Sequence, residues 1–248
     1  MRPIALLALL PVLFSLMFVQ DKQSPAQRKD SASVSAGISK EQLALEDQLN
    51  AVLSDAKDAL QRGRTADAVK QYEAALAMVH KEPLLAEQET RVLKEAGNGY
   101  IQANRPNDAI ATFEKLVAIL DKECDSLLET CANAEQDLGI ARMRARDFAG
   151  ALESLRKAEV IYERAEKSGG LHEYSMIQVM NQAKTKLLMA VALFQLGKTS
   201  DAIKTTEDAI PQFNRVKDDN GINVGIRDSA TSSLNDAQTV LRRFKSAQ

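Results

Sequence analysis

The stretch that decides the fold is GRTADAVKQYEAAL, at residues 63–76. A Gly-Arg turn signal opens it, and small and apolar residues follow at helical spacing. At four places along the chain, a turn signal lies between a small residue and an alanine twelve places later. The four pairs are Ala56/Ala68, Gly97/Ala109, Gly139/Ala151 and Ala190/Ala202. This repetition predicts four pairs of antiparallel helices, with one small side chain on each helix facing the other at a close crossing.

Bulky residues and turn signals support the same arrangement. A bulky side chain stands four places after the second small residue at Tyr72, Phe113 and Leu155, whereas Thr206 breaks the pattern. Turn-forming residues lie between the two small residues of each pair. They are Gly63-Arg64, Asn104-Arg105-Pro106-Asn107, Arg146-Asp147 and Gly197-Lys198. Each unit is therefore predicted to be a helix, a tight turn and a second helix.

The repeated segments resemble the start of the second helix in the tetratricopeptide repeat (TPR) family. They are GRTADAVKQYEAAL (63–76), RPNDAIATFEKL (105–116), RDFAGALESLRKA (146–158) and GKTSDAIKTTEDAI (197–210). Successive units are 41, 42 and 51 residues apart, and the first two steps are similar to the long-period variant of kinesin light chains. The resemblance implies an all-α fold, a right-handed α-solenoid of about four TPR-like helical hairpins over residues 41–217.

Residues 218–248 are expected to form a loop and a C-terminal capping helix. Ile226 to Phe244 carries its apolar residues on one helical face, which can cover the exposed side of a terminal repeat. Two signals interrupt helices before this point. Ser168-Gly169-Gly170 predicts a helix stop inside the 51-residue step, and Pro211 predicts a kink or an early end of the last repeat helix.

The N-terminal region has the pattern of a targeting segment. Arg2 precedes an apolar run at residues 4–19, which is short for a bilayer-spanning helix. We predict a signal peptide or N-terminal anchor at residues 1–26 and a flexible linker at 27–40, with order beginning near Ser39 at a capping-box sequence. The predicted protein is bacterial and exported, periplasmic or secreted. The alternative is an inner-membrane protein anchored by residues 4–19, and the membrane is a partner only in that case.

Composition excludes several functions. The chain has 248 residues and a formal net charge of −2, so it lacks the basic excess typical of non-specific nucleic-acid binding. It has two histidines, His80 and His172, and neither stands at a catalytic or metal-binding spacing. Gly97-Asn98-Gly99 lacks the pattern of a phosphate-binding loop. We therefore expect no catalytic residues, no metal and no cofactor, and a chain that is not an enzyme.

Cys124 and Cys131 leave two alternatives open. In one continuous helix, residues seven apart would be about 10 Å apart along the axis, too far for a disulfide. The repeat frame instead places a reversal of the chain between them, where a disulfide could join the corner in an oxidising compartment. The alternative is two reduced, half-buried thiols.

In the TPR family the first helices of successive repeats line a concave groove, and the resemblance assigns groove positions here. Nine polar residues fall at such positions: Lys57, Arg91, Lys94, Asn98, Gln102, Asn133, Gln136, Arg144 and Lys184. The set has no acidic member, which predicts a protein or peptide ligand of acidic character. The predicted function is a non-enzymatic protein- or peptide-binding scaffold of the cell envelope. The alternative is a membrane-tethered assembly subunit acting through the solenoid edges.

Overall fold

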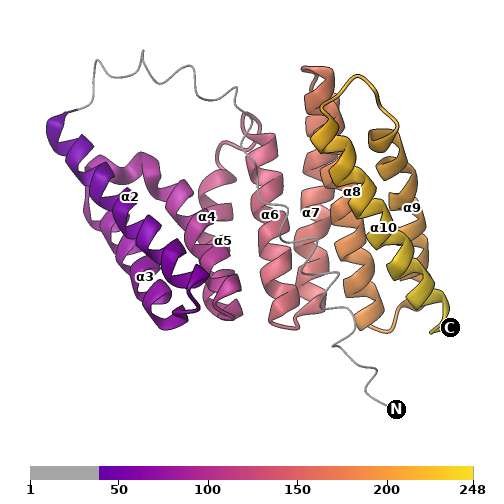
Figure 1. The fold of residues 1–248 in the computed structure, drawn as a ribbon, viewed down its shortest axis with the longest axis horizontal. Helices are drawn as coiled ribbons and strands as arrows, with labels where there is room; N and C mark the ends of the chain where they lie inside the picture. The colour runs from indigo at the N-terminus through magenta and orange to yellow at the C-terminus, as the bar shows by residue number, and fades with distance from the viewer. Residues whose placement is uncertain (1–38, 248) are drawn as a thin grey trace. The chain divides into compact units, whose positions relative to one another are not determined.

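The computed structural model describes residues 39–247, which form nine α-helices and one 3₁₀-helix, with no strand among them (Figure 1). The predicted all-α fold built of helical hairpins is confirmed. The predicted signal peptide or anchor at residues 1–26, and nearly all of the predicted linker, lie outside the described residues. None of the helices within residues 39–247 is both long enough and apolar enough to cross a membrane.

Residues 39–122 form one compact unit, called the N-terminal unit below. In this unit α2 pairs with α3 and α4 pairs with α5, and a short 3₁₀-helix, η3, leads from α3 to α4. The bounds are α2 Lys40–Gln61, α3 Thr65–Lys81, η3 Pro83–Gln88, α4 Glu89–Gln102 and α5 Pro106–Leu120. Ser39 caps α2, since its hydroxyl accepts a hydrogen bond from the Gln42 backbone N–H at 3.0 Å.

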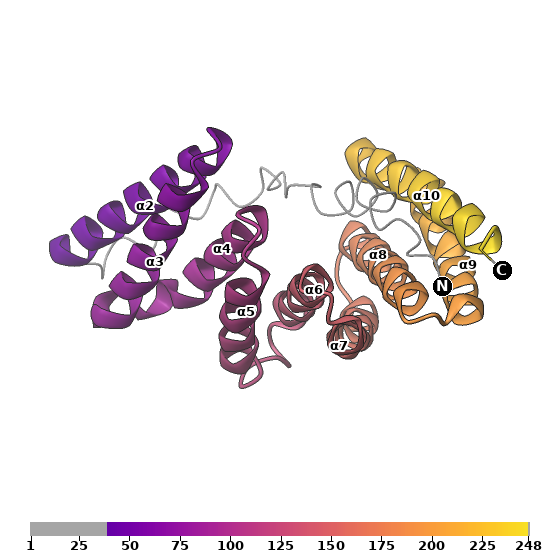
Figure 2. The same cartoon turned by 90° about the horizontal axis from the view of Figure 1, so that it is seen from below.

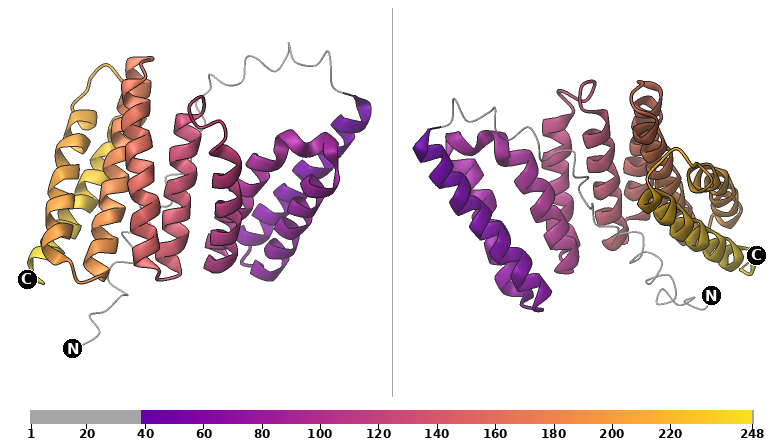
Figure 3. Two further views of the ribbon diagram at one scale, coloured as in Figure 1. Left: turned by 180° about the vertical axis from the view of Figure 1, so that it is seen from behind. Right: turned by 45° about the horizontal axis from the view of Figure 1, so that its top comes forward.

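Residues 123–247 form a second compact unit, the C-terminal unit. Here α6 pairs with α7 and α8 with α9, and α10 packs against α9 and α8 (Figure 3). The bounds are α6 Leu128–Arg144, α7 Phe148–Lys167, α8 His172–Gln195, α9 Thr199–Lys217 and α10 Val224–Lys245. The ring of Phe244 on α10 stacks on that of Phe194 on α8, with centroids 4.5 Å apart. The structure therefore contains the helix predicted to cap the last repeat.

The small residues of the sequence pattern lie where the paired helices cross. The six alanines of the pattern, among them Ala56 and Ala68, are each 0% exposed, and both glycines are buried. A Cβ at Gly97 would lie 2.6 Å from the Phe113 ring, and one at Gly139 would lie 2.7 Å from the Leu155 side chain. In these two hairpins, the bulky residue four places after the second small residue thus packs directly over the first small residue of the same hairpin.

All four hairpin turns share one backbone design. The second residue after each first helix has a positive φ: Gly63 (71°), Asn104 (56°), Arg146 (66°) and Gly197 (75°). In the first turn, Gly63 N–H donates to the Leu60 carbonyl and Arg64 N–H to the Ala59 carbonyl, and the other three turns repeat this pair of bonds. This is the Schellman arrangement, which satisfies the last carbonyls of a helix and reverses the chain.

The structure contradicts one of the two outcomes expected at Pro211. The last repeat helix was expected to kink or to end early there, and α9 does not end but continues through this residue to Lys217. Proline removes one backbone hydrogen bond, but Ala209, Phe213 and Val216 on the same helix are 0% exposed. Burial of these side chains on both sides of Pro211 outweighs the missing bond. The predicted stop at Ser168-Gly169-Gly170 is correct, since α7 ends at Lys167 and α8 begins at His172.

Candidate binding surface

The first helices of the hairpins share one side of each unit. In Figure 2, α2 and α4 lie on one side of the N-terminal unit, with α3 and α5 on the other. Within the C-terminal unit, α6 and α8 lie on the side away from α7 and α9 (Figure 2). The side of the N-terminal unit that α2 and α4 form (Figure 2) is called the α2–α4 face below.

Two of the predicted cations on the α2–α4 face are already paired. Lys57 Nζ lies 2.8 Å from Glu95 Oε2. Arg91 donates to Asn50 Oδ1 at 3.0 Å and to Gln88 Oε1 at 2.8 Å, and its Nη1 lies 3.4 Å from Glu95 Oε1. Glu95 thus links α2 to α4 through Lys57, and it also holds the guanidinium of Arg91.

Glu95 corrects the expectation that the candidate groove has no acidic member. The sequence argument took residues at fixed offsets from the small markers, and Glu95 stands at an offset that was not counted. The signal that could have found it is its spacing of four from Arg91, because oppositely charged residues at i and i+4 meet on one helical face. The positive charge of this face is therefore smaller than the nine-residue set implied.

Three candidates on α4 remain open. The side chains of Lys94, Asn98 and Gln102 make no hydrogen bond or ion pair with other residues in the described part of the chain. Lys94 and Asn98 are half-buried and Gln102 is exposed. They follow one another at intervals of four, so they form one row along the helix. We call them the α4 row.

The C-terminal unit uses two of its candidates for its own packing. Asn133 Oδ1 accepts a hydrogen bond from the hydroxyl of Tyr162 on α7 at 2.6 Å. Gln136 Nε2 donates to Thr185 Oγ1 on α8 at 2.6 Å. These amides were predicted to serve a ligand, and the structure gives each of them a partner within the fold.

The remaining two candidates are half-buried cations. Arg144 is the last residue of α6, and burial lowers the pKa of its guanidinium below the usual value. Lys184 lies on α8. Neither is as exposed as Gln102.

Cys124 and Cys131 are separate thiols in the structure, with no disulfide between them. Cys124 is half-buried in the turn before α6, and Cys131 is 3% exposed in the first turn of α6. The two residues do not lie in one continuous helix, as the repeat frame predicted. Asp125, between them, binds Arg164 of α7 with its Oδ1 2.6 Å from Nη2.

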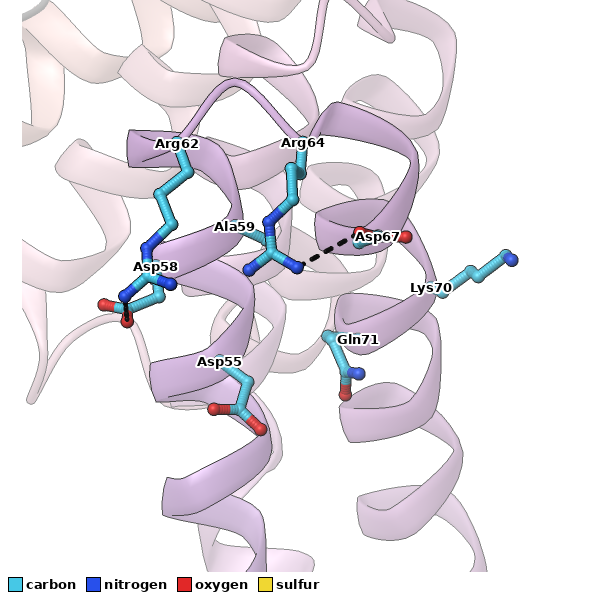
Figure 4. A pocket seen from close by; sticks show the side chains of 8 residues that line it. All are labelled: Asp55, Asp58, Ala59, Arg62, Arg64, Asp67, Lys70 and Gln71. Carbon is cyan, nitrogen blue, oxygen red and sulfur yellow. Dashed lines mark hydrogen bonds and ion pairs between the residues drawn. The ribbon is translucent and has the colours of Figure 1, made fainter.

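A polar cleft of about 360 Å³ lies at the turn between α2 and α3 (Figure 4). Its lining is Asp55, Asp58, Ala59, Arg62, Arg64, Asp67, Lys70 and Gln71. Arg62 pairs with Asp58 at 3.2 Å and Arg64 with Asp67 at 3.4 Å, and all four side chains are more than half exposed. Exposed pairs of this kind contribute little to stability, so the cleft has the character of solvated surface.

The histidines and carboxylates do not converge on a metal site within residues 39–247. His172 instead forms a structural contact. Its Nε2 lies 2.6 Å from Asp219 Oδ2, which ties the start of α8 to the loop between α9 and α10. His80 is exposed in the last turn of α3.

Comparison with solved structures identifies the fold. TPR-like repeats from Podosopora anserina, of a protein assigned as a kinesin light chain, are 18% identical and match 80% of this chain and 94% of theirs, with a TM-score of 0.54. Their Q17M variant is 17% identical, with coverage of 80% and 93% and a TM-score of 0.54. BtubC (BKLC) from P. vanneervenii is 15% identical, covers 82% and 90%, and has a TM-score of 0.51.

No protein-family model matches the sequence, and no curated protein matches it either. The similarity to the solved structures shows that the chain has the fold of TPR-like repeat proteins, as its repeated segments predicted.

Proposed function

We propose that this protein is a non-enzymatic scaffold that binds a segment of a partner protein on the side formed by the first helices of its hairpins. The TPR-like fold supports a role in protein interaction. The observation that carries the proposal is the α4 row: three adjacent polar side chains, on a first helix, without partners among the described residues. A rigid helical face presents such groups in a fixed arrangement, so little entropy is lost there on binding.

The proposed partner segment is acidic, and the nine predicted residues contribute unequally to its binding. Lys94, Asn98 and Gln102 can contact the ligand directly. Lys57 and Arg91 are paired with Glu95, so they act on the ligand mainly through the net positive charge that the two cations and Glu95 have together. In the C-terminal unit Arg144 and Lys184 are the candidate cations, and Asn133 and Gln136 hold the helices together.

The test is a paired charge reversal, Lys94→Glu with Arg144→Glu. We expect this variant to lose capture of the native partner from an extract of the source cells, while circular dichroism shows unchanged helix content. A matched control is Lys115→Glu with Lys204→Glu, since these are exposed lysines on the second helices α5 and α9. Equal capture by both double variants would overturn the proposal.

We further propose that the protein works in the cell envelope after export. The support is the charged residue Arg2 ahead of the apolar run at residues 4–19. Mass spectrometry of the mature protein should find an N-terminus near Gln27 in a soluble envelope fraction. An intact N-terminus in the membrane fraction would instead favour a tethered assembly subunit.

A further inference from the structure

The loop that joins α9 to α10 contains an asparagine followed by a glycine, Asn220-Gly221, and both residues are exposed. In such a pair the backbone nitrogen of the glycine can attack the side-chain amide carbon of the asparagine and close a five-membered imide. Glycine favours this step because it has no Cβ to hinder the close approach of its backbone. The loop is therefore a place where the chain can modify itself.

The nucleophilic nitrogen of this pair is in contact with a base. The Gly221 N–H donates to Asp219 Oδ1 at 2.8 Å. The other oxygen of the same carboxylate, Oδ2, lies 2.6 Å from His172 Nε2, at the start of α8 beside the loop (Figure 1). A carboxylate that accepts this N–H can take up its proton as the nitrogen attacks, and the distance is within the reach of general-base catalysis. Asp219 is thus held in position to activate the nitrogen.

The amide carbonyl of Asn220 is in contact with a cation. Arg227, half-buried near the start of α10, donates from Nη1 to Asn220 Oδ1 at 2.8 Å. Attack on the amide carbon turns this carbonyl oxygen into an oxyanion. A guanidinium already bound to the oxygen stabilises the negative charge as it develops, because hydrogen bonds between charged groups are the stronger ones. The loop therefore combines a nucleophile, a base and an oxyanion donor around one amide.

A second asparagine–glycine pair in the same chain provides a comparison. Asn98 and Gly99 lie inside α4, where Asn98 is half-buried and Gly99 is buried. The N–H of a residue within an α-helix belongs to the hydrogen bonds between residues four apart, so attack by the Gly99 nitrogen would require local unfolding of the helix. Any difference in reactivity between the two pairs in the folded chain therefore reports their structural setting and not their sequence.

We propose that Asn220 is a site of self-catalysed deamidation, in which Asp219 is the base and Arg227 stabilises the oxyanion. The Gly221 nitrogen forms a bond to Asn220 Cγ, and its proton passes to Asp219. The Cγ–Nδ2 bond then breaks, and ammonia leaves with the proton that Asp219 returns. Water opens the imide at either carbonyl, which gives aspartate or isoaspartate at position 220.

The reaction changes the loop that anchors α10. In the aspartate product a carboxylate replaces the amide opposite Arg227, so that contact becomes an ion pair. Isoaspartate instead adds a methylene to the main chain between Asp219 and Gly221. The Gly221 N–H then no longer meets the Asp219 carboxylate in the present geometry, and the contact from His172 to the loop is loosened. The isoaspartate form should therefore hold the start of the capping helix less firmly.

The first experiment incubates the full chain at neutral pH, folded and in urea, and follows both pairs by peptide mapping with mass spectrometry. In the folded chain we expect an amide to be converted to a carboxylate at Asn220 and not at Asn98, and in urea at both. The rate at Asn220 should be higher in the folded chain than in urea. A lower folded rate would show that the contacts protect the amide, and it would overturn the proposal.

The second experiment removes each assisting group. Arg227→Gln and Asp219→Ala should each slow the folded reaction at Asn220 by about fivefold or more, because each removes a group that acts on the reacting atoms. The matched controls are Arg242→Gln, an exposed arginine of α10, and Asp218→Ala, the exposed neighbour of Asp219, and both should react like the wild type. All five proteins should react alike in urea. Unchanged or faster folded reaction in the first two variants would refute the assigned roles.

The third experiment tests the consequence for α10. The aspartate and isoaspartate forms of the aged protein are separated by chromatography, and amide hydrogen exchange is compared over residues 219–230. We expect faster exchange in the isoaspartate form, with residues 199–210 of α9 unchanged. Equal exchange in the two forms would contradict the loosening of the loop.

Discussion

Gly99 shows at the scale of one residue why the hairpins can approach closely. A methyl group at this position would lie 2.1 Å from the ring of Tyr72, which belongs to the preceding hairpin. The sequence pattern identified Gly97 and Tyr72 but gave no reason for a second glycine two places later. The contact crosses between hairpins, and a repeat with fixed offsets within one hairpin does not contain it.

We expect Gly99→Ala to lower the free energy of unfolding by about 1–3 kcal/mol, because the Tyr72 ring must move. In an unobstructed helix the same change would stabilise by roughly 0.5–1 kcal/mol, so the sign is diagnostic. Urea denaturation measures the difference. Tyr72→Leu added to Gly99→Ala should recover part of the loss, and a single variant as stable as the wild type would rule out the clash.

Arg146 is the hairpin-turn residue least suited to its backbone conformation. Its φ is 66°, where the equivalent positions in two other turns hold Gly63 and Gly197. A left-handed conformation costs a residue with a Cβ about 1–2 kcal/mol, and glycine avoids this cost. Glycine also loses more conformational entropy on folding, which offsets part of that gain. We therefore predict that Arg146→Gly stabilises the chain by about 0.5–1 kcal/mol in thermal or chemical denaturation.

The converse change supplies the control. Gly197→Ala places a Cβ in the same conformation and should destabilise the chain by about 1 kcal/mol. If both variants shifted stability in one direction, the shared design of the turns would not be the reason.

At the scale of helices, the contact between α3 and α4 predicts a dependence on alkaline pH. Tyr72 and Tyr100 lie edge to face with ring centroids 6.1 Å apart. Burial is the main cause that raises the pKa of each phenol to about 12. The negative charge of Glu95 adds to the effect at Tyr72, and that of Glu73 adds to it at Tyr100. The phenolate is thus disfavoured in the folded chain. The contribution of the two neutral phenols to the free energy of unfolding is complete below pH 10, and it is lost as the pH rises towards 12.

Denaturation at several pH values between 9 and 12 measures this loss, and phenolate absorbance reports the ionisation. Replacing both residues by phenylalanine should flatten the pH dependence and remove the component that ionises near pH 12. If the double variant instead lost a component near pH 10, the two rings would not be buried as described.

The connection before α6 gives a prediction on thiol chemistry. Cys124 is half-buried and Cys131 is 3% exposed, so a maleimide should label Cys124 first in the native, reduced chain. The disulfide that the sequence left open is decided by labelling under denaturing, non-reducing conditions. Two reactive thiols in protein purified from an oxidising compartment would exclude it.

Most helices could be predicted from the sequence, because the small residues, the turn signals and the helix stop at residues 168–170 are local features. The early end that was one of the two outcomes expected at Pro211 is an error of another kind. Whether a helix continues past proline depends on tertiary packing, here on Phe213 and Val216, both fully buried. Local preference and the spacing of twelve carry no information on that balance.

At the scale of the whole chain, fold and binding surface were predictable to different degrees. The small residues at helix crossings are required by packing, so the TPR-like fold follows from them. The nine candidate ligand residues came from position in a repeat, and position does not say whether a side chain is already engaged. Tyr162 holds Asn133 and Thr185 holds Gln136, from segments 29 and 49 residues away.

The most direct test of the central claim is an isothermal titration of one acidic decapeptide into the wild type, Lys94→Glu and Lys115→Glu, with thermal melting of all three. We predict at least tenfold weaker binding to Lys94→Glu alone, with all melting temperatures alike. The same Kd for the three proteins would contradict a binding surface centred on α4.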